Sequence, residues 1–260
     1  MAEASDTQES FISHLIELRT RLMRSIVAVV IVLAALFPFA KDIYALLAEP
    51  LLRALPKGAT MIATDVTGTF LVPLKVTLVA AFLIALPYVL WQVWAFVAPG
   101  LYQHEKRLVL PVLVSSCVFF LCGMTFAYFV VFPVAFHFFA HYTPAGVQMM
   151  TDIDKYVTFV LKMFIAFGVT FETPVVIVVL VRMGVVSLAK LKSVRPYAIV
   201  GAFVVGALFT PPDILSQCLL AVPLYMLFEL GLLLARFVSS PATRAPGAEG
   251  ENERGSEPAN

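Results

Sequence analysis

Long apolar segments separated by short polar ones constrain this chain more than any other feature of its sequence. A hydrocarbon core about 30 Å thick needs roughly 20 consecutive helical residues. Six segments of the 260-residue chain are candidates: residues 22–40, 70–98, 108–136, 157–181, 196–210 and 214–235. Only 13% of the residues are charged, whereas about a quarter are charged in a soluble domain. We therefore predict an all-α polytopic membrane protein with six transmembrane helices in one bundle.

Polar segments flank this predicted membrane domain, which is expected to span residues 11–238. Residues 1–10 are polar and acidic, and they lack the basic start and apolar run of a cleaved signal peptide. We interpret them as an N-terminal tail. Residues 239–260 have almost no large apolar side chains, so we predict a disordered C-terminal tail there.

Lysine and arginine are distributed unevenly between the two sides of the predicted bundle. Cytoplasmic loops of membrane proteins carry an excess of these residues. One side holds Arg19, Arg21, Arg24, Lys106, Arg107, Arg182, Lys190, Lys192, Arg195 and Arg236. The other side has four basic residues diluted by acidic ones in long loops. The pattern predicts that both termini lie in the cytoplasm, and the net charge of +1 indicates no nucleic-acid partner.

The last two predicted spans are short. Pro196 to Thr210 provides 15 residues, about 22 Å of helix. The return segment has only 15 residues, Ile214 to Phe228, before Glu229. We therefore expect the bilayer to be thinner beside this hairpin, or its neighbours to shelter it.

A stripe of polar side chains lies on the predicted helix that leads into the first span. His14, Glu17, Arg21 and Arg24 follow one another at steps of three or four residues, so they share one helix face. One interpretation is a Glu17–Arg21 pair at i and i+4 that contributes a few tenths of a kcal/mol and has no further function. The other is that Glu17 belongs to a surface that binds a cationic peptide.

The same two interpretations apply to Glu105, which falls at the start of the third span after Pro99 and Gly100. A carboxylate there complements the helix dipole and needs no other function. However, the same side of the membrane would then hold two carboxylates, with aromatic residues typical of a membrane interface nearby. These aromatic residues are Trp91, Trp94, Phe96 and Tyr102.

Glu172 lies near the middle of the fourth predicted span. A charged carboxylate there costs at least a few kcal/mol and persists mainly where it faces protein or water. Pro174 frees a backbone carbonyl near Thr170 and is expected to bend the helix. Either Glu172 is protonated and bonded to that backbone, or it is a polar socket for a side chain from a partner's transmembrane helix.

Several longer stretches cover about residues 11–238: SHLIELRTRL (13–22), TMIATDV (60–66), YVLWQVWAFVAPGLYQHEKR (88–107), FAYFVVFP (126–133), FGVTFETPVV (167–176), RPYAIVGAFVVGALFTPPD (195–213) and Gln217. In order and spacing they resemble the TatC family, the core receptor subunits of the twin-arginine protein translocase. The resemblance implies a concave, glove-shaped bundle that recognises folded proteins with consecutive arginines in an N-terminal signal. It implies that Glu17 and Glu105 bind these arginines, and that Arg19 and Phe96 belong to the same site.

The resemblance also implies partners. Single-span TatA- and TatB-type subunits would dock near Glu172, Gln217 and the last two spans, and the chain would associate with itself and with membrane lipid. The implied location is the bacterial cytoplasmic (inner) membrane, with transport driven by the proton-motive force. Two other matching residues are assigned structural roles: Asp213 caps the sixth span, and Pro50 shapes the first outer loop.

The residues indicate no enzyme and no cofactor. The four histidines form no metal-ligand set, and P-loop and G-x-S-x-G motifs are absent from the sequence. The competing hypothesis is a proton-coupled carrier of a small molecule, with Glu172 as its titrating group. Such a carrier usually has a solute site between two repeats, and no repeat is evident here.

Overall fold

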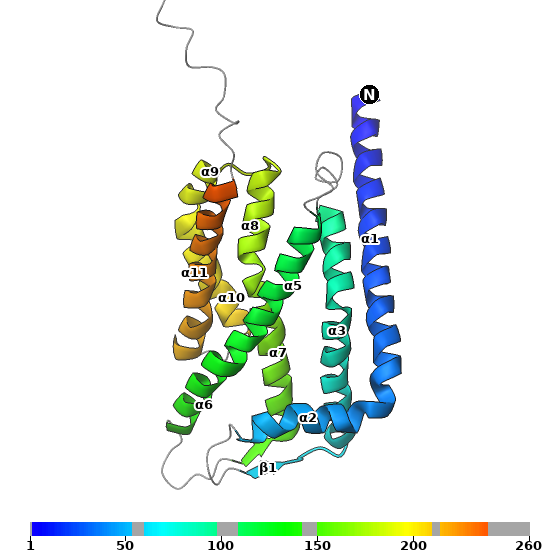
Figure 1. Cartoon of the computed structure of the whole chain (residues 1–260), viewed down its shortest axis with the longest axis vertical. Coiled ribbons are helices and arrows are strands. Elements are labelled where there is room, and N and C mark those ends of the chain that lie inside the picture. The colour runs from blue at the N-terminus through cyan, green and yellow to red at the C-terminus, as the bar shows by residue number, and fades with distance from the viewer. Residues whose placement is uncertain (1, 54–59, 98–108, 142–149, 210–213, 239–260) are drawn as a thin grey trace, which may run out of the picture.

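The computed structural model describes residues 2–53, 60–97, 109–141, 150–209 and 214–238, and this part of the chain is almost entirely helical (Figure 1). The predicted fold class is confirmed. The helices are α1 (Ala2–Leu36), the single turn η1 (Phe37–Phe39), α2 (Ala40–Arg53), α3 (Gly68–Val97), α5 (Val109–Phe126), the π-helical turn η3 (Ala127–Val131), α6 (Phe132–His141), α7 (Ile153–Phe171), α8 (Thr173–Arg182), α9 (Leu188–Ser193), α10 (Arg195–Phe209) and α11 (Ile214–Val238). Two short strands, β1 (Thr60–Ile62) and β2 (Met150–Asp152), complete the described elements.

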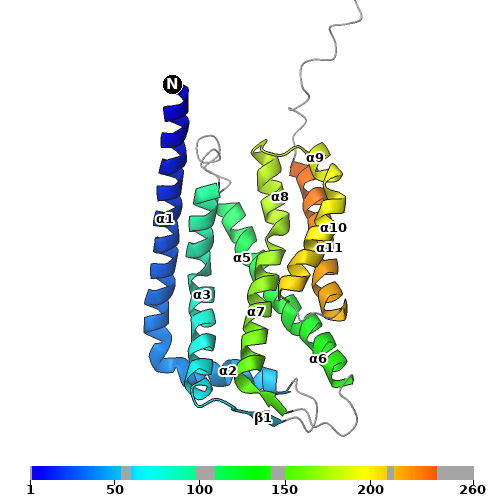
Figure 2. The same ribbon diagram turned by 180° about the vertical axis from the view of Figure 1, so that it is seen from behind.

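The helices α1 and α3 form one side of the molecule, and α8, α10 and α11 form the other (Figure 1). The diagonal helix α5 and its continuation α6 cross between them together with α7. The two ends of the bundle differ. The amino-terminal end holds the start of α1, the end of α3 and α9, whereas the strand end holds α2, β1 and β2 (Figures 1 and 2).

The core lies where α3, α5 and α7 meet. Val72, Val76 and Phe167 are almost fully buried there. The crossing of α5 and α7 is tight because it is built on glycine. A Cβ on Gly123 would overlap the Phe167 carbonyl, and a Cβ on Gly168 would overlap the Phe120 ring.

The fourth predicted span is interrupted near Pro174, where the sequence predicts a bend. α7 ends at Phe171, Glu172 lies between the two helices, and α8 begins at Thr173. Proline has no N–H to donate to the carbonyl one turn earlier, so the helix cannot continue unchanged through this position. The break places Glu172 at the junction of two helix axes.

Five helical segments of the described residues are long and apolar enough to cross a membrane. The fifth predicted span is α10, which is short at 15 residues, so the count of six crossings stays a prediction. α11 is 25 residues long and does not end before Glu229. Glu229 lies inside this helix and forms an ion pair of 2.6 Å with Arg195 at the start of α10.

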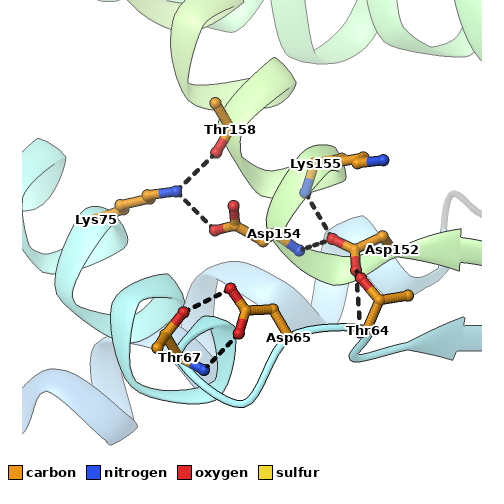
Figure 3. Close-up of polar contacts among 8 residues, drawn as sticks. All are labelled: Thr64, Asp65, Thr67, Lys75, Asp152, Asp154, Lys155 and Thr158. Carbon is orange, nitrogen blue, oxygen red and sulfur yellow. Dashed lines mark hydrogen bonds and ion pairs between the residues drawn. The ribbon is translucent and has the colours of Figure 1, made fainter.

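Polar contacts around Asp152 and Asp154 join the two loops at the strand end, and we call this group of contacts the clasp. β1 and β2 pair in parallel, with Ile62 opposite Asp152 (Figure 3). Asp152 caps α7 by accepting hydrogen bonds from the backbone N–H groups of Asp154 and Lys155, and it also accepts bonds from the hydroxyl and N–H of Thr64. The Thr64 hydroxyl, followed by the Lys155 N–H, holds the pKa of Asp152 at about 2 because both stabilise the charged form.

The clasp also reaches α3. The ammonium of Lys75 lies 2.6 Å from a carboxylate oxygen of Asp154 and 3.1 Å from the Thr158 hydroxyl (Figure 3). Asp65 accepts hydrogen bonds from the hydroxyl and N–H of Thr67 just before α3 begins, and the hydroxyl bond lowers its pKa most. Together these contacts fix the starts of α3 and α7 against each other.

Candidate functional site

Glu17 lies near the middle of α1, and its carboxylate is held by Arg21 one turn later. The Nε and Nη2 atoms of Arg21 donate to the same oxygen, Oε1, at 2.8 and 2.6 Å. No described residue donates to the other oxygen of Glu17, and 39% of this side chain remains exposed. The ion pair that the sequence pattern predicts is therefore present, yet it leaves half of the carboxylate available.

The polar stripe of α1 faces the end of α3. The ring of His14 stacks on Phe96, with centroids 4.3 Å apart and an interplanar angle of 18°. The Nη1 atom of Arg21 lies 3.4 Å from the side-chain oxygen of Gln92, a buried residue one turn before Phe96. These contacts bring Glu17 and Phe96, two of the predicted site residues, to one surface.

Arg19 lies on a different face of α1 from Glu17. It lines a groove along α1 that Tyr88 of α3 borders on the other side, and we call this the α1 groove. The structure therefore does not place the Arg19 guanidinium against Glu17. Glu105 and Asp213 fall outside the described residues, and so does the side chain of Pro50, whose backbone belongs to α2.

Glu172 is buried at the break between α7 and α8, with 9% of its surface exposed. Ser116 and Cys117 of α5 lie beside it. Ser116 is itself bonded, because the indole N–H of Trp94 donates to its hydroxyl oxygen at 2.7 Å. Among the described residues, neither carboxylate oxygen of Glu172 has a hydrogen bond of ordinary geometry.

The backbone carbonyl that Pro174 leaves without its helical partner is not bonded to Glu172. The hydroxyl of Thr173 donates to the Thr170 oxygen at 2.7 Å and so satisfies that carbonyl. This excludes the explanation in which Glu172 is bonded to the freed backbone. A buried polar side chain left without partners costs about 1–3 kcal/mol.

Gln217 lies in the hairpin of α10 and α11. Its amide nitrogen donates to the Phe203 backbone oxygen at 3.0 Å, and its side chain packs against Gly206. One end of this polar side chain is thus used to join the two helices. Its amide oxygen accepts no hydrogen bond from the described residues.

A second groove, of about 660 Å³, follows α11 on the side of α5 and α7. We call it the α11 groove. Phe171, the neighbour of Glu172, lies in its wall, and the wall is apolar apart from Arg195, Glu229 and Arg236. Gly231 brings α11 into close contact with Pro174 and Ile177 of α8. The α11 groove, Glu172 and α8 are therefore parts of one region.

Gln92 and Ser116 were not predicted from the sequence as members of these sites, and neither was the bond from Trp94 to Ser116. The sequence does contain a signal for Gln92, because a single amide side chain in a largely apolar helix indicates a polar contact. Ser116 and Trp94 form their bond across two helices, and no spacing within either helix predicts it.

Comparisons of the sequence with known proteins all point to one protein family. Residues 13–223 match the family model of TatC, the Sec-independent protein translocase protein. The chain is 57% identical over 228 residues to the Sec-independent protein translocase protein TatC of Azotobacter chroococcum, covering 88% of this chain and 89% of that one. It is 55% identical over 232 residues to the TatC protein of Escherichia coli K12, covering 89% and 90%.

The fold matches as well. A crystal structure of the twin-arginine translocase receptor TatC superimposes with a TM-score of 0.77 at 40% identity, covering 87% of this chain and all of that one. A second crystal structure of the same receptor gives a TM-score of 0.76, again at 40% identity, with 85% and 99% covered. With its sequence matched over most of its length and its helices arranged in the same way, the chain belongs to the TatC family of Sec-independent protein translocase proteins.

Proposed function

We propose that this chain is the receptor subunit of a Sec-independent translocase, and that its amino-terminal end binds signal peptides with consecutive arginines. The observation that carries this proposal is the half-exposed carboxylate of Glu17, which has one oxygen held by Arg21 and the other without a partner among the described residues. A guanidinium that docks here forms charge-assisted hydrogen bonds to a carboxylate that is already in position. Lysine lacks the planar fork of donors that suits this geometry.

The other members of the proposed arginine site come from the family resemblance. Glu105 supplies the second carboxylate, so that each of two arginines has an acidic partner. Phe96 provides an aromatic surface beside Glu17, where a guanidinium stacks favourably. Arg19 stays a predicted member on the resemblance alone, because it lies on another face of α1.

We also propose that the region around Glu172 and Gln217 receives the transmembrane helices of TatA- and TatB-type partners. Within the described part of the chain the Glu172 carboxylate and the Gln217 amide oxygen have no hydrogen-bond donor, so both can accept hydrogen bonds from a partner, and the apolar α11 groove offers packing surface. In this proposal Pro174 holds Glu172 at the helix break, Pro50 shapes the outer loop and Asp213 caps α11. Transport of folded proteins then uses the proton-motive force, and the passage involves other chains, including further copies of this one.

For the orientation we propose that the amino-terminal end faces the cytoplasm, with both termini there, in the bacterial inner membrane. The basic residues Lys190 and Lys192 on α9, together with Arg19 and Arg24 on α1, support this orientation. Membership of a translocase family favours the receptor over the small-molecule carrier, and we assign the chain no catalytic activity.

The decisive experiment measures binding of a twin-arginine peptide and a twin-lysine peptide to the purified full chain. We expect selective binding of the arginine peptide, weakened about tenfold or more in Glu17→Ala and in Glu105→Ala. Asp42→Ala, which removes one carboxylate from α2 at the strand end, is the matched control and is expected to bind normally. Equal binding of both peptides, or binding that survives both substitutions, would reject the arginine site.

Co-purification tests the second half of the proposal. A receptor retains single-span helices and arginine-signal precursors. A carrier retains a small solute and no such helix, and that outcome would restore the alternative function.

A further inference from the structure

The α1 groove changes in character along its length. It has a volume of about 610 Å³ and lies between α1 and Tyr88 of α3. Arg19 and Arg24 line its part nearest the amino-terminal end, and Val27 and Ile31 line the rest. From Arg19 to Ile31 the helix rises about 18 Å, at 1.5 Å for each of 12 residues. The groove is therefore cationic at one end and apolar over the remainder.

The two arginines of the groove have no counter-charge within the described part of the chain. Neither guanidinium forms a hydrogen bond or ion pair with a described residue, and both side chains are exposed. The nearby Thr20 hydroxyl donates its proton to the Ile16 carbonyl at 2.8 Å, so it is not free as a donor. Two like charges on one groove repel each other unless an anion lies between them.

The apolar part of the groove is open as well. Met23, Val27 and Ile31 are each about half exposed or more, at 52%, 49% and 64%. Tyr88 forms an edge-to-face contact with Trp91, with ring centroids 6.2 Å apart. Tyrosine and tryptophan gather at the headgroup level of a bilayer, so this pair marks the level at which the cationic end of the groove meets the lipid headgroups.

We infer that the α1 groove is a binding site for one anionic phospholipid. The headgroup phosphate pairs with Arg19 and Arg24, and an acyl chain lies along Met23, Val27 and Ile31. Guanidinium groups pair with phosphate through two hydrogen bonds in a fixed geometry, and basic pockets on transmembrane helices bind anionic headgroups. The inference needs only that α1 and α3 span a bilayer, so it stands independently of the proposed receptor role.

A signal peptide is the other occupant to consider, and the charges disfavour it. Consecutive arginines entering this groove would meet Arg19 and Arg24, whereas Glu17, which does not line the groove, offers them a carboxylate outside it. Repulsion between like charges at close range opposes that arrangement. The lipid has the sign of charge and the apolar length that the groove requires.

The test is a lipid titration of the purified full chain, with bound lipid counted by native mass spectrometry. Phosphatidylglycerol is compared with phosphatidylcholine carrying the same acyl chains. We expect the wild-type chain to prefer phosphatidylglycerol by about tenfold or more, and the double variant Arg19→Gln/Arg24→Gln to lose that preference. Lys190→Gln/Lys192→Gln removes two exposed charges from α9 at the same end of the bundle and is expected to keep it.

Two further arms separate a lipid site from a site for a free anion or a peptide. Val27→Trp narrows the apolar part while keeping both arginines, and it is expected to weaken phosphatidylglycerol binding. A large excess of inorganic phosphate is expected to leave the lipid bound. Any of four outcomes would overturn the inference. The two double variants could lose the lipid preference equally, or Val27→Trp could bind phosphatidylglycerol as well as the wild type does. Inorganic phosphate could displace the lipid, or a signal peptide could cross-link to position 27.

Discussion

The imidazole of His14 stacks on the ring of Phe96 at a centroid distance of 4.3 Å, which ties α1 to the end of α3 one turn before Glu17. The contact fixes the relative position of an acid on one helix and an aromatic ring on another. A receptor for arginine needs both groups held at a set distance, because guanidinium pairing and stacking are each directional.

Replacing His14 tests the importance of this stack. His14→Ala removes the ring, and an aromatic pair contributes about 0.5–1.5 kcal/mol beyond its buried area. We expect binding of a twin-arginine peptide to weaken about two- to tenfold. His14→Phe keeps the stack and is expected to bind nearly as the wild type does. Equal losses in the two variants would show that the imidazole acts in some way other than stacking.

Glu172 is expected to promote binding of single-span partners and to lower the thermal stability of the isolated subunit. Glu172→Leu removes a buried carboxylate without a hydrogen-bond partner in the described chain, so we expect thermal unfolding of the purified subunit at the same or a higher temperature. Co-purification of single-span partners is expected to fall in the same variant and in Glu172→Ala.

The control for Glu172 is Thr125→Val, which removes a hydroxyl bonded only within its own helix. It is expected to change neither property. Normal partner recovery with Glu172→Leu and Glu172→Ala would reject the polar socket, and a clear loss of stability in Glu172→Leu would mean that the carboxylate stabilises the fold itself.

The glycines at the crossing of α5 and α7 are expected to tolerate no side chain. Gly123→Ala places a methyl group against the Phe167 carbonyl, which is backbone and has little freedom to move. We expect the free energy of unfolding to fall by about 1–3 kcal/mol. Denaturant titration of the purified protein in detergent measures this loss. Gly201→Ala in α10 is the comparison, because a Cβ there meets no atom within 4 Å. Equal stability of the two variants would contradict the tight crossing.

The clasp at the strand end predicts a dependence of stability on acidity. The folded chain holds the pKa of Asp152 at about 2, whereas an unfolded aspartate titrates near 3.9. The unfolded chain therefore binds more protons at low pH. The stabilisation from Asp152 is complete above about pH 5 and is lost as the pH falls towards 2.

Melting temperatures measured between pH 6 and pH 3 check this expectation. We expect a smaller acid-induced decrease in Asp152→Asn than in the wild type. Asp42→Asn, at the same end on α2, serves as the control and is expected to retain the full decrease. Parallel curves for all three proteins would exclude Asp152 as a source of the acid sensitivity.

The sequence predicts the helices of this fold well because hydropathy and proline act locally. The long apolar runs mark the five long helical segments, and the residues around Pro174 predict the break between α7 and α8. The Glu17–Arg21 pair is predicted for the same reason, since both residues lie on one helix one turn apart.

Contacts between elements are predicted less well, because no periodicity encodes them. The strands β1 and β2 have three residues each, which is too short for an alternating pattern. The bond from Trp94 to Ser116 depends on how α3 and α5 cross. The position of Arg19 also had to come from the structure, because resemblance places a residue in a family site without showing which way its side chain points.

The pairing of β1 with β2 has a consequence for how the protein is made. Thr64 and Asp152 are 88 positions apart, and two long apolar helical segments lie between them in the chain. A growing chain cannot close the clasp until residue 152 has been synthesised and has reached the same side of the membrane as β1. The hairpin of α1 and α3 is therefore synthesised first and stays without its contacts to β2 until the middle of the polypeptide has followed, so assembly at the strand end is completed late.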